Sequence, residues 1–361
     1  RRGLQARPAA RWPSVDAMLA ELARTTAPRR RWPYALLTVA LAGGAVFAVS
    51  PAAGPSCELP SSLWPSVRVR ERLREVAPAR AAAIERGVGD ALEAWHERWR
   101  AERETACRRE DVAREACLDR QRTQVGAVLD QLALADAAVA EGAIDAARRL
   151  PSPRSCAGAL AEDTDPELAR RLAEAEALRR VGRFAQARDR ARHLAVDAAR
   201  TNHPALELRA ALLHAEALYD TGEGGAAVTA LHQVIELASE RRDDHAIAEA
   251  LVHLVSTHAA VANFGAHETA SRLAEVALHR AGGDPELAAM LAMGRCRIGW
   301  RRPPQEHDRG VVDCGEAARQ WRALRGDDAP ELAWVANQLG MLAVVDDRHT
   351  EALVHFQEFE E

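Results

Sequence analysis

Four stretches in the second half of the chain share one pattern: a helix-forming segment, then a small or turn-forming residue, then an alanine five residues later. The paired positions are Gly182 with Ala187, Gly222 with Ala227, Gly265 with Ala270, and Asp347 with Ala352. The alanines are 40, 43 and 82 residues apart, and the last interval has room for one degenerate unit around 294–322. Such a period is typical of a stacked array of helix pairs.

Two further signals support helix pairs. Seven residues before each turn stand Ala175, Ala215, His258 and Gly340, three of which are small enough for two helices to cross closely. The segments "DPEL", "HPAL", "DPEL" and "APEL" place a proline at residues 166, 204, 285 and 330. Proline is well tolerated in the first turn of a helix, where its missing N–H has no partner to lose. We therefore expect the leading helix of a pair to begin at each of these prolines.

Composition agrees with an all-α protein. The chain has 361 residues, 48% of them hydrophobic, and all 48 of its basic residues are arginines. Ala, Leu, Arg and Glu dominate and only 4% of residues are aromatic, which favours helix. The net charge of −5 does not suggest nucleic-acid binding. The 13 histidines are scattered and no CxxC or HExxH motif occurs, so we expect no metal site.

An uncharged stretch near the N-terminus predicts a membrane span. Residues 34–49 carry no charge, and the stretch extends to residue 53, about the length that crosses a bilayer as a helix. Three arginines at 29–31 precede it, and no basic residue follows until Arg68. The positive-inside rule then places the N-terminus in the cytoplasm and the repeats in the periplasm of a bacterial inner-membrane protein. A buried helix of a soluble protein and a cleaved signal peptide are the alternatives.

The region 54–160 predicts helices and disulfides. We expect a short helix at 67–76, a long helix at 79–114 in which Trp95 and Trp99 are packing anchors, and a second long helix that ends near Leu150. Four cysteines lie here, and an even number in an oxidising compartment favours bridges. The preferred pairing is Cys57 with Cys156 and Cys107 with Cys117, and free buried thiols are the alternative.

The opening segment "RGLQARPAARWPSVDAMLAEL" resembles the end of the C-terminal lobe of bacterial eukaryotic-like serine/threonine protein kinases. The resemblance implies that Arg11 pairs with a glutamate upstream of residue 1, and that ATP and Mg²⁺ belong to a preceding kinase domain. The segment itself has no lysine, Gly-rich loop, HRD or DFG motif and needs no cofactor. A juxtamembrane helix that matches by chance is the alternative.

The repeated units resemble tetratricopeptide repeats of the longer-helix variety, with a generic α-solenoid as the alternative. That resemblance implies a groove along the leading helices that binds a protein or peptide. The groove positions that it implies are Glu176, Arg179, Arg209, Glu216, Tyr219, Trp334, Asn337 and Met341.

Together these features divide the chain into a kinase-lobe end, a basic linker, a transmembrane helix, a helical region with four cysteines, and a solenoid whose C-terminus we expect to be truncated. The bounds are 1–27, 28–33, 34–53, 54–160 and 161–361. The function expected from this order is the membrane-anchored sensor region of a kinase, whose repeats bind a partner, with homodimerisation as the hypothesis for how binding is passed through the span. The alternative is a membrane-tethered repeat scaffold without kinase activity.

Overall fold

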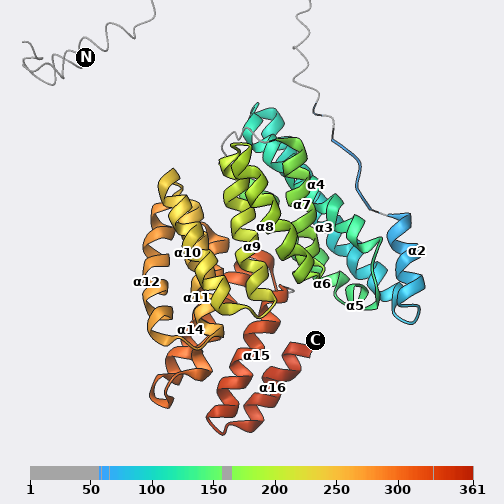
Figure 1. The fold of residues 1–361 in the computed structure, drawn as a ribbon. Helices are drawn as coiled ribbons and strands as arrows, with labels where there is room; N and C mark the ends of the chain where they lie inside the picture. The colour runs from blue at the N-terminus through green and yellow to red at the C-terminus, as the bar shows by residue number, and fades with distance from the viewer. Residues whose placement is uncertain (1–56, 58, 65, 157–164, 328, 361) are drawn as a thin grey trace, which may run out of the picture. The chain divides into compact units, whose positions relative to one another are not determined.

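The described part of the protein is entirely helical. The computed structural model describes residues 57, 59–64, 66–156, 165–327 and 329–360, which form fifteen α-helices and three short 3-10 segments, with no strand among them (Figure 1). All of them belong to the second of two compact units, which covers residues 55–361. The all-α expectation is thereby confirmed for these ranges.

The membrane assignment has to be corrected. Within the described ranges, no helix combines the length and the apolar character that a bilayer crossing needs. The segment 34–53, the basic linker 28–33 and Arg11 all lie outside the described residues. The assignment as a single-pass inner-membrane protein is therefore not supported.

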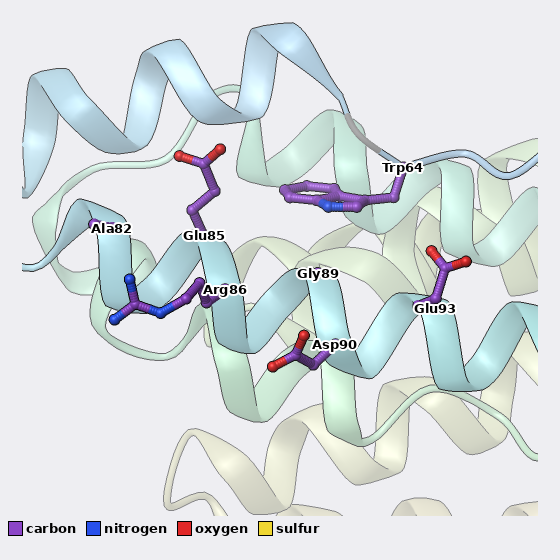
Figure 2. Close-up of a pocket in the computed structure, with 7 residues that line it drawn as sticks. All are labelled: Trp64, Ala82, Glu85, Arg86, Gly89, Asp90 and Glu93. Atoms are coloured by element: carbon purple, nitrogen blue, oxygen red, sulfur yellow. The ribbon is translucent and has the colours of Figure 1, made fainter.

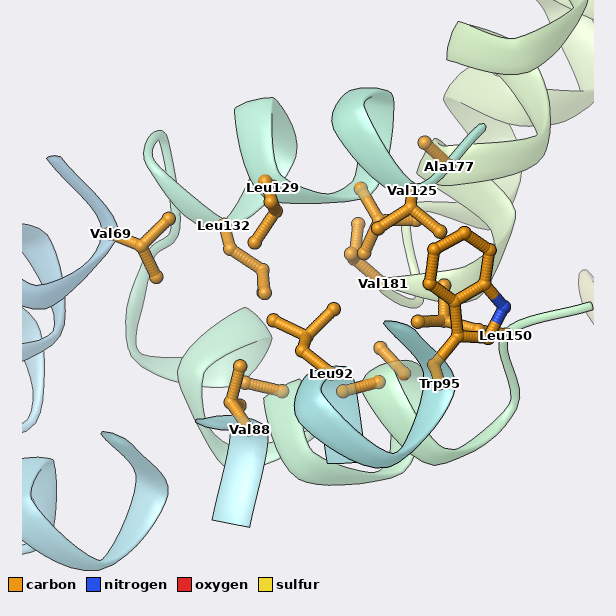
Figure 3. Close-up of a cluster of buried hydrophobic side chains, with 14 of the residues drawn as sticks. Val69, Val88, Leu92, Trp95, Val125, Leu129, Leu132, Leu150, Ala177 and Val181 are labelled. Carbon is orange, nitrogen blue, oxygen red and sulfur yellow. The ribbon is translucent and has the colours of Figure 1, made fainter. Parts of the chain in front are cut away.

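The first described helices share one apolar core. Their bounds are α2 Val67–Val76, α3 Ala81–Arg108, α4 Val112–Leu132, α5 Ala137–Glu141 and α6 Ala143–Arg148. Figure 3 shows side chains of α2, α3 and α4 converging with Ala177 and Val181, so this core also packs against the next helix, α7. The helix after α3 ends at Leu132 rather than near Leu150, because Asp136 accepts a hydrogen bond from the Val139 N–H and starts α5.

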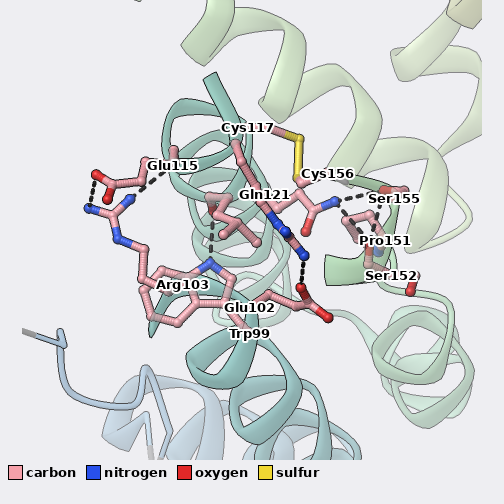
Figure 4. The surroundings of a disulfide bond; sticks show 12 residues. Trp99, Glu102, Arg103, Glu115, Cys117, Gln121, Pro151, Ser152, Ser155 and Cys156 are labelled. Atoms are coloured by element: carbon pink, nitrogen blue, oxygen red, sulfur yellow. Dashed lines mark hydrogen bonds and ion pairs between the residues drawn. A yellow bond between two sulfur atoms is a disulfide. The ribbon is translucent and has the colours of Figure 1, made fainter. Parts of the chain in front are cut away.

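The two tryptophans of "AWHERW" are packing anchors, as the sequence indicated. Trp95 and Trp99 are buried, and their ring centroids are 6.3 Å apart. Their indole N–H groups donate to the carbonyl oxygens of Pro151 at 2.8 Å and Leu118 at 2.9 Å. The Trp99 bond is visible in Figure 4 and joins α3 to α4.

The predicted disulfide pairing is wrong. Cys57 pairs with Cys107 and Cys117 pairs with Cys156, the second bridge being drawn in Figure 4. The chain does turn between α3 and α4, with Glu110 at a φ of 54°. Cys107 lies in the last turn of α3, whereas Cys117 lies about 7 Å along α4 from its start, so the two sulfurs end at different heights. A third bridge, Cys296–Cys314, was not anticipated.

Five helix pairs follow, which we call hairpins, and each places two helices against each other across a short connection. Four of their leading helices begin at the expected prolines. The pairs are α7 Pro166–Arg180 with α8 Phe184–Arg200, α9 Pro204–Asp220 with α10 Gly224–Arg241, α11 Asp244–Ala260 with α12 Phe264–Arg280, α13 Pro285–Arg297 with α14 His307–Arg325, and α15 Pro330–Val345 with α16 His349–Glu360.

Four of the five hairpins contain the same turn. Gly182, Gly222, Ala262 and Asp347 have φ between 55° and 81°, and in each case the next N–H donates to a carbonyl five residues back, as in a Schellman motif. The third turn therefore falls at Ala262, three residues before the expected Gly265, which lies inside α12. Counted from the turn at Ala262, the position equivalent to Ala187 is His267, and the position equivalent to Ala215 is Val255. The sequence pattern had placed Ala270 and His258 at these positions.

The small residues before the turns let the two helices of a hairpin approach closely. Ala175 and Ala215 have no exposed surface. A Cβ on Gly340 would lie 2.5 Å from the Phe356 ring, so only glycine fits against that large side chain. In this last hairpin a bulky residue of the second helix is thus accommodated by the absence of a side chain on the first.

The fourth hairpin departs from the pattern. Here α13 ends at Arg297, and two 3-10 segments, Gly299–Arg301 and Pro304–Glu306, replace the short turn. The backbones of Gly299 and Gly310 touch, since a Cβ on either would lie 2.9 Å from the Cα of the other. The Cys296–Cys314 disulfide also joins the two helices.

Replacing both Cys296 and Cys314 with alanine should lower the free energy of unfolding by about 3 kcal/mol, because the bridge closes an 18-residue separation in the unfolded chain. The matched C117A/C156A variant removes a bridge that spans a separation of 39 residues, which should lower the free energy of unfolding by about 4 kcal/mol. Urea unfolding of the oxidised proteins, followed by circular dichroism, measures both. An unchanged midpoint for C296A/C314A would show that the fourth hairpin does not depend on its cross-link.

Candidate functional site

The eight expected groove positions lie on leading helices, and the structure brings four of them into two clusters. The first, which we call the polar cluster, comprises Arg179, Glu216, Asp220, Glu249 and His253 from α7, α9 and α11. The second, the aromatic–arginine cluster, comprises Tyr219, Arg297 and Trp334 from α9, α13 and α15.

The remaining groove candidates are divided. Glu176 accepts a hydrogen bond from Arg209 at 3.2 Å and a second one from Gln124 of α4. Asn337 and Met341 are half-buried on α15. Among the described residues neither of these two side chains is hydrogen-bonded to the clusters. Four of the eight expected residues therefore lie in the clusters, and Glu176 and Arg209 pair with each other outside them.

Arg179 joins α7 to α9. Its Nη1 donates to Glu216 at 3.1 Å and its Nε donates to Asp220 at 2.6 Å, and the two carboxylates lie one turn apart on α9. Hydrogen bonds between charged groups are stronger than those between neutral groups, and here one guanidinium binds two carboxylates. The pair fixes the rotation of α7 against α9 on the side where the leading helices meet.

Glu216 is the centre of the polar cluster. Nε2 of His253 lies 2.8 Å from its carboxylate, on the opposite side from Arg179. Burial would raise the pKa of Glu216, but Arg179 and His253 outweigh it and lower that pKa to about 2. Burial would likewise lower the pKa of His253, and Glu216 raises it instead. The two groups therefore favour a charged pair across α9 and α11.

Glu249 lies one turn before His253 on α11 and behaves in the opposite way. Burial raises the pKa of this carboxyl, with part of the effect offset by His253 and the charge of Glu216 adding to it. The ionised form of Glu216 is thus strongly favoured, whereas the ionised form of Glu249 is disfavoured. The polar cluster acts as a charged layer between helices that are otherwise joined by alanine and leucine.

The aromatic–arginine cluster has a different character. The Arg297 guanidinium carbon lies 5.6 Å from the Tyr219 ring centroid and 5.8 Å from the Trp334 centroid, and a guanidinium N–H donates to the Tyr219 hydroxyl. No carboxylate of the described residues lies within ion-pair distance of Arg297. The Trp334 side chain is 42% exposed. A cation held by two ring faces thus keeps donors for an anion supplied from outside.

Sequence reasoning missed Arg297, His253 and Glu249. Glu249 stands thirteen residues before the turn at Ala262, as Arg209 does before Gly222, so a correct register would have found it. The placement of the third turn at Gly265 hid that relation. Arg297 had no such signal, because the fourth hairpin lacks the shared turn from which positions are counted.

A shallow hollow lies at the other end of the described residues. It has a volume of about 470 Å³, and in Figure 2 the Trp64 ring lies flat along α3 between Glu85 and Glu93. Gly89 makes this possible, since a Cβ there would lie 2.8 Å from the indole nitrogen. Glu85 is already paired with Arg74 at 3.3 Å. Among the described residues, no group of three or more His, Cys, Asp or Glu side chains is placed to hold a metal ion.

Comparisons with known proteins give no support to the resemblances drawn from the sequence. No family model matches the chain, and neither the curated proteins nor the solved structures yield a match. The assignment to a eukaryotic-like kinase with tetratricopeptide repeats is therefore corrected. What the structure establishes is that the described residues are entirely helical and include five successive hairpins.

Replacing Glu249 with glutamine should stabilise the protein more at pH 8 than at pH 4.5. The unfolded chain ionises this carboxyl near its ordinary pKa of 4.5, whereas the folded chain ionises it at a higher pH, so the native state loses stability as pH rises through that interval. Glutamine does not ionise and escapes this loss.

The measurement is the urea midpoint of Glu249→Gln and of the parent protein at both pH values. Glu240→Gln, on the exposed side of α10, is the matched control and should show no such pH dependence. A stability difference that is the same at pH 4.5 and pH 8 would contradict the assignment.

Proposed function

We propose that the five hairpins form an α-solenoid that binds a segment of a protein or peptide partner along the face of its leading helices. Each leading helix contacts the next one, from α7 to α9, α11, α13 and α15, which supports a continuous face of this kind. The proposal concerns partner binding alone and includes neither the kinase assignment nor the membrane assignment.

The observation that carries the proposal is the aromatic–arginine cluster. Trp, Tyr and Arg are the residue types that most often dominate binding energy at protein interfaces. Here all three meet at one place, from helices of the second, fourth and fifth hairpins. The Arg297 guanidinium is already ordered by two rings, so a partner carboxylate would bind it with little further loss of side-chain entropy.

This geometry favours an acidic segment as the partner. Arg179 and Arg209 on the same face are both engaged by carboxylates of the chain itself, whereas Arg297 has none among the described residues. An aspartate or glutamate of the partner would form an ion pair with Arg297, and apolar side chains next to it in the partner would cover the exposed part of Trp334. The remaining polar cluster would act as a rigid support for this contact.

Selection from a displayed library of random twelve-residue peptides on the full chain tests the proposal. Selected peptides should be rich in Asp or Glu, and their synthetic versions should bind Arg297→Gln and Trp334→Ala about ten-fold more weakly than the parent. Fluorescence anisotropy of labelled peptides measures this. Arg272→Gln, an exposed arginine of α12, is the matched control and should leave binding unchanged.

Two results would overturn the proposal. One is a library that yields no saturable binder. The other is a set of peptides that bind the Arg297→Gln and Trp334→Ala variants as tightly as the parent protein, which would place the contact elsewhere.

A further inference from the structure

A second hollow lies where the fourth hairpin departs from the common pattern. It has a volume of about 840 Å³, within the range of small-molecule sites, and lies between α12, the two 3-10 segments and the start of α14. Its walls include Phe264, Ile298, Pro303, Arg301, Arg302 and Arg309. This hollow is separate from the clusters of the leading helices.

The hollow has a structural cause that keeps it in place. The other hairpins connect their helices through a three-residue turn, whereas here nine residues separate α13 from α14. The Cys296–Cys314 bridge joins α13 to α14, and the contact between Gly299 and Gly310 holds the first 3-10 segment against α14. A preformed and braced cavity loses little entropy when a ligand enters.

Arginine donors exceed the acceptors available to them. The Arg302 side chain is only 4% exposed, and its Nη1 donates to Glu268 at 3.4 Å and Glu306 at 3.1 Å, while its Nε is buried without a partner. Arg309 shares Glu268 at 2.8 Å and is half-exposed. A buried donor that lacks a partner is costly, so an acceptor on a ligand that reaches the Arg302 Nε would be stabilising.

The charge and the apolar wall together define the ligand. Three arginines and two glutamates line the hollow, which leaves one positive charge. That surplus matches a singly charged carboxylate better than a phosphate monoester, which carries nearly two negative charges at neutral pH. Ile298 is buried in the wall and Phe264 is partly exposed, so the body of the ligand would meet hydrocarbon.

We propose that this hollow binds a small organic monocarboxylate with an aromatic or aliphatic body. The carboxylate would lie against Arg309 and the buried Arg302, in competition with Glu268, and the body would lie on Phe264 and Pro303. The inference does not depend on the peptide-binding role.

The test uses the full oxidised chain with phenylacetate, 4-phenylbutanoate and octanoate as probes, measured by isothermal titration and ligand-observed NMR. Each acid should bind at least about ten-fold more tightly than its amide, because the amide lacks the charge-assisted hydrogen bonds. Glu268→Gln frees both arginines from an internal carboxylate and should tighten binding several-fold. Arg309→Gln should weaken it about ten-fold.

The controls separate ligand binding from folding. Arg302 is too buried to be replaced safely, so both variants change partly exposed side chains, and thermal unfolding checks that each is folded. Arg319→Gln, an exposed arginine of α14 that pairs with Glu316, should leave affinity unchanged. Equal binding of acid and amide, tighter binding of phenyl phosphate, unchanged affinity in Arg309→Gln, or no saturable binding to the parent and Glu268→Gln at 10 mM would each overturn the proposal.

Discussion

Close packing of helices through small side chains is the constraint on which this fold depends. Ala175, Ala215 and Gly340 stand at corresponding positions before their turns and are shielded from solvent. Larger side chains at these three positions would push the two helices of a hairpin apart, since protein interiors tolerate little change in volume. The third hairpin has the buried Val255 at the equivalent position, and Gly294 of α13 leaves room for it. The shared turn with its positive φ fixes where the second helix begins. Both proposed binding sites lie on this repeated frame or at the hairpin that departs from it.

Much of the frame could be predicted from local chemistry. Proline at the start of a leading helix and glycine at a left-handed turn act through their own backbone, so the starts at 166, 204, 285 and 330 and the turns at Gly182 and Gly222 were found. The third turn was misplaced because Gly265 looks like a turn residue, whereas the chain uses Ala262 and caps α12 with Asn263. Disulfide pairing depends on how helices stack, and sequence spacing alone does not contain that information.

The candidate site shows the same division. Glu176, Arg179, Arg209, Glu216 and Tyr219 were named as groove positions that the repeat resemblance implies, and the structure places all five on α7 and α9. Arg297 was missed because its role depends on two rings contributed by helices that are distant in sequence. The hollow beside α14 was missed for a related reason, since it arises from the loss of the common turn rather than from any motif. Irregular positions in a regular frame are where function is most often located.

The distribution of the cross-links has a mechanical consequence. Two disulfides lie within the region 57–156 and one joins residues 296 and 314. The helices α7 to α12 therefore lie in a stretch that no disulfide cross-links. Under tension applied at the chain ends, the stretch between Cys156 and Cys296 can extend by about 3.3 Å per residue, whereas the closed loops hold their length. The polar cluster spans α7, α9 and α11 in the middle of this extensible stretch. Its ion pairs therefore resist, along the load path, a separation that no disulfide prevents.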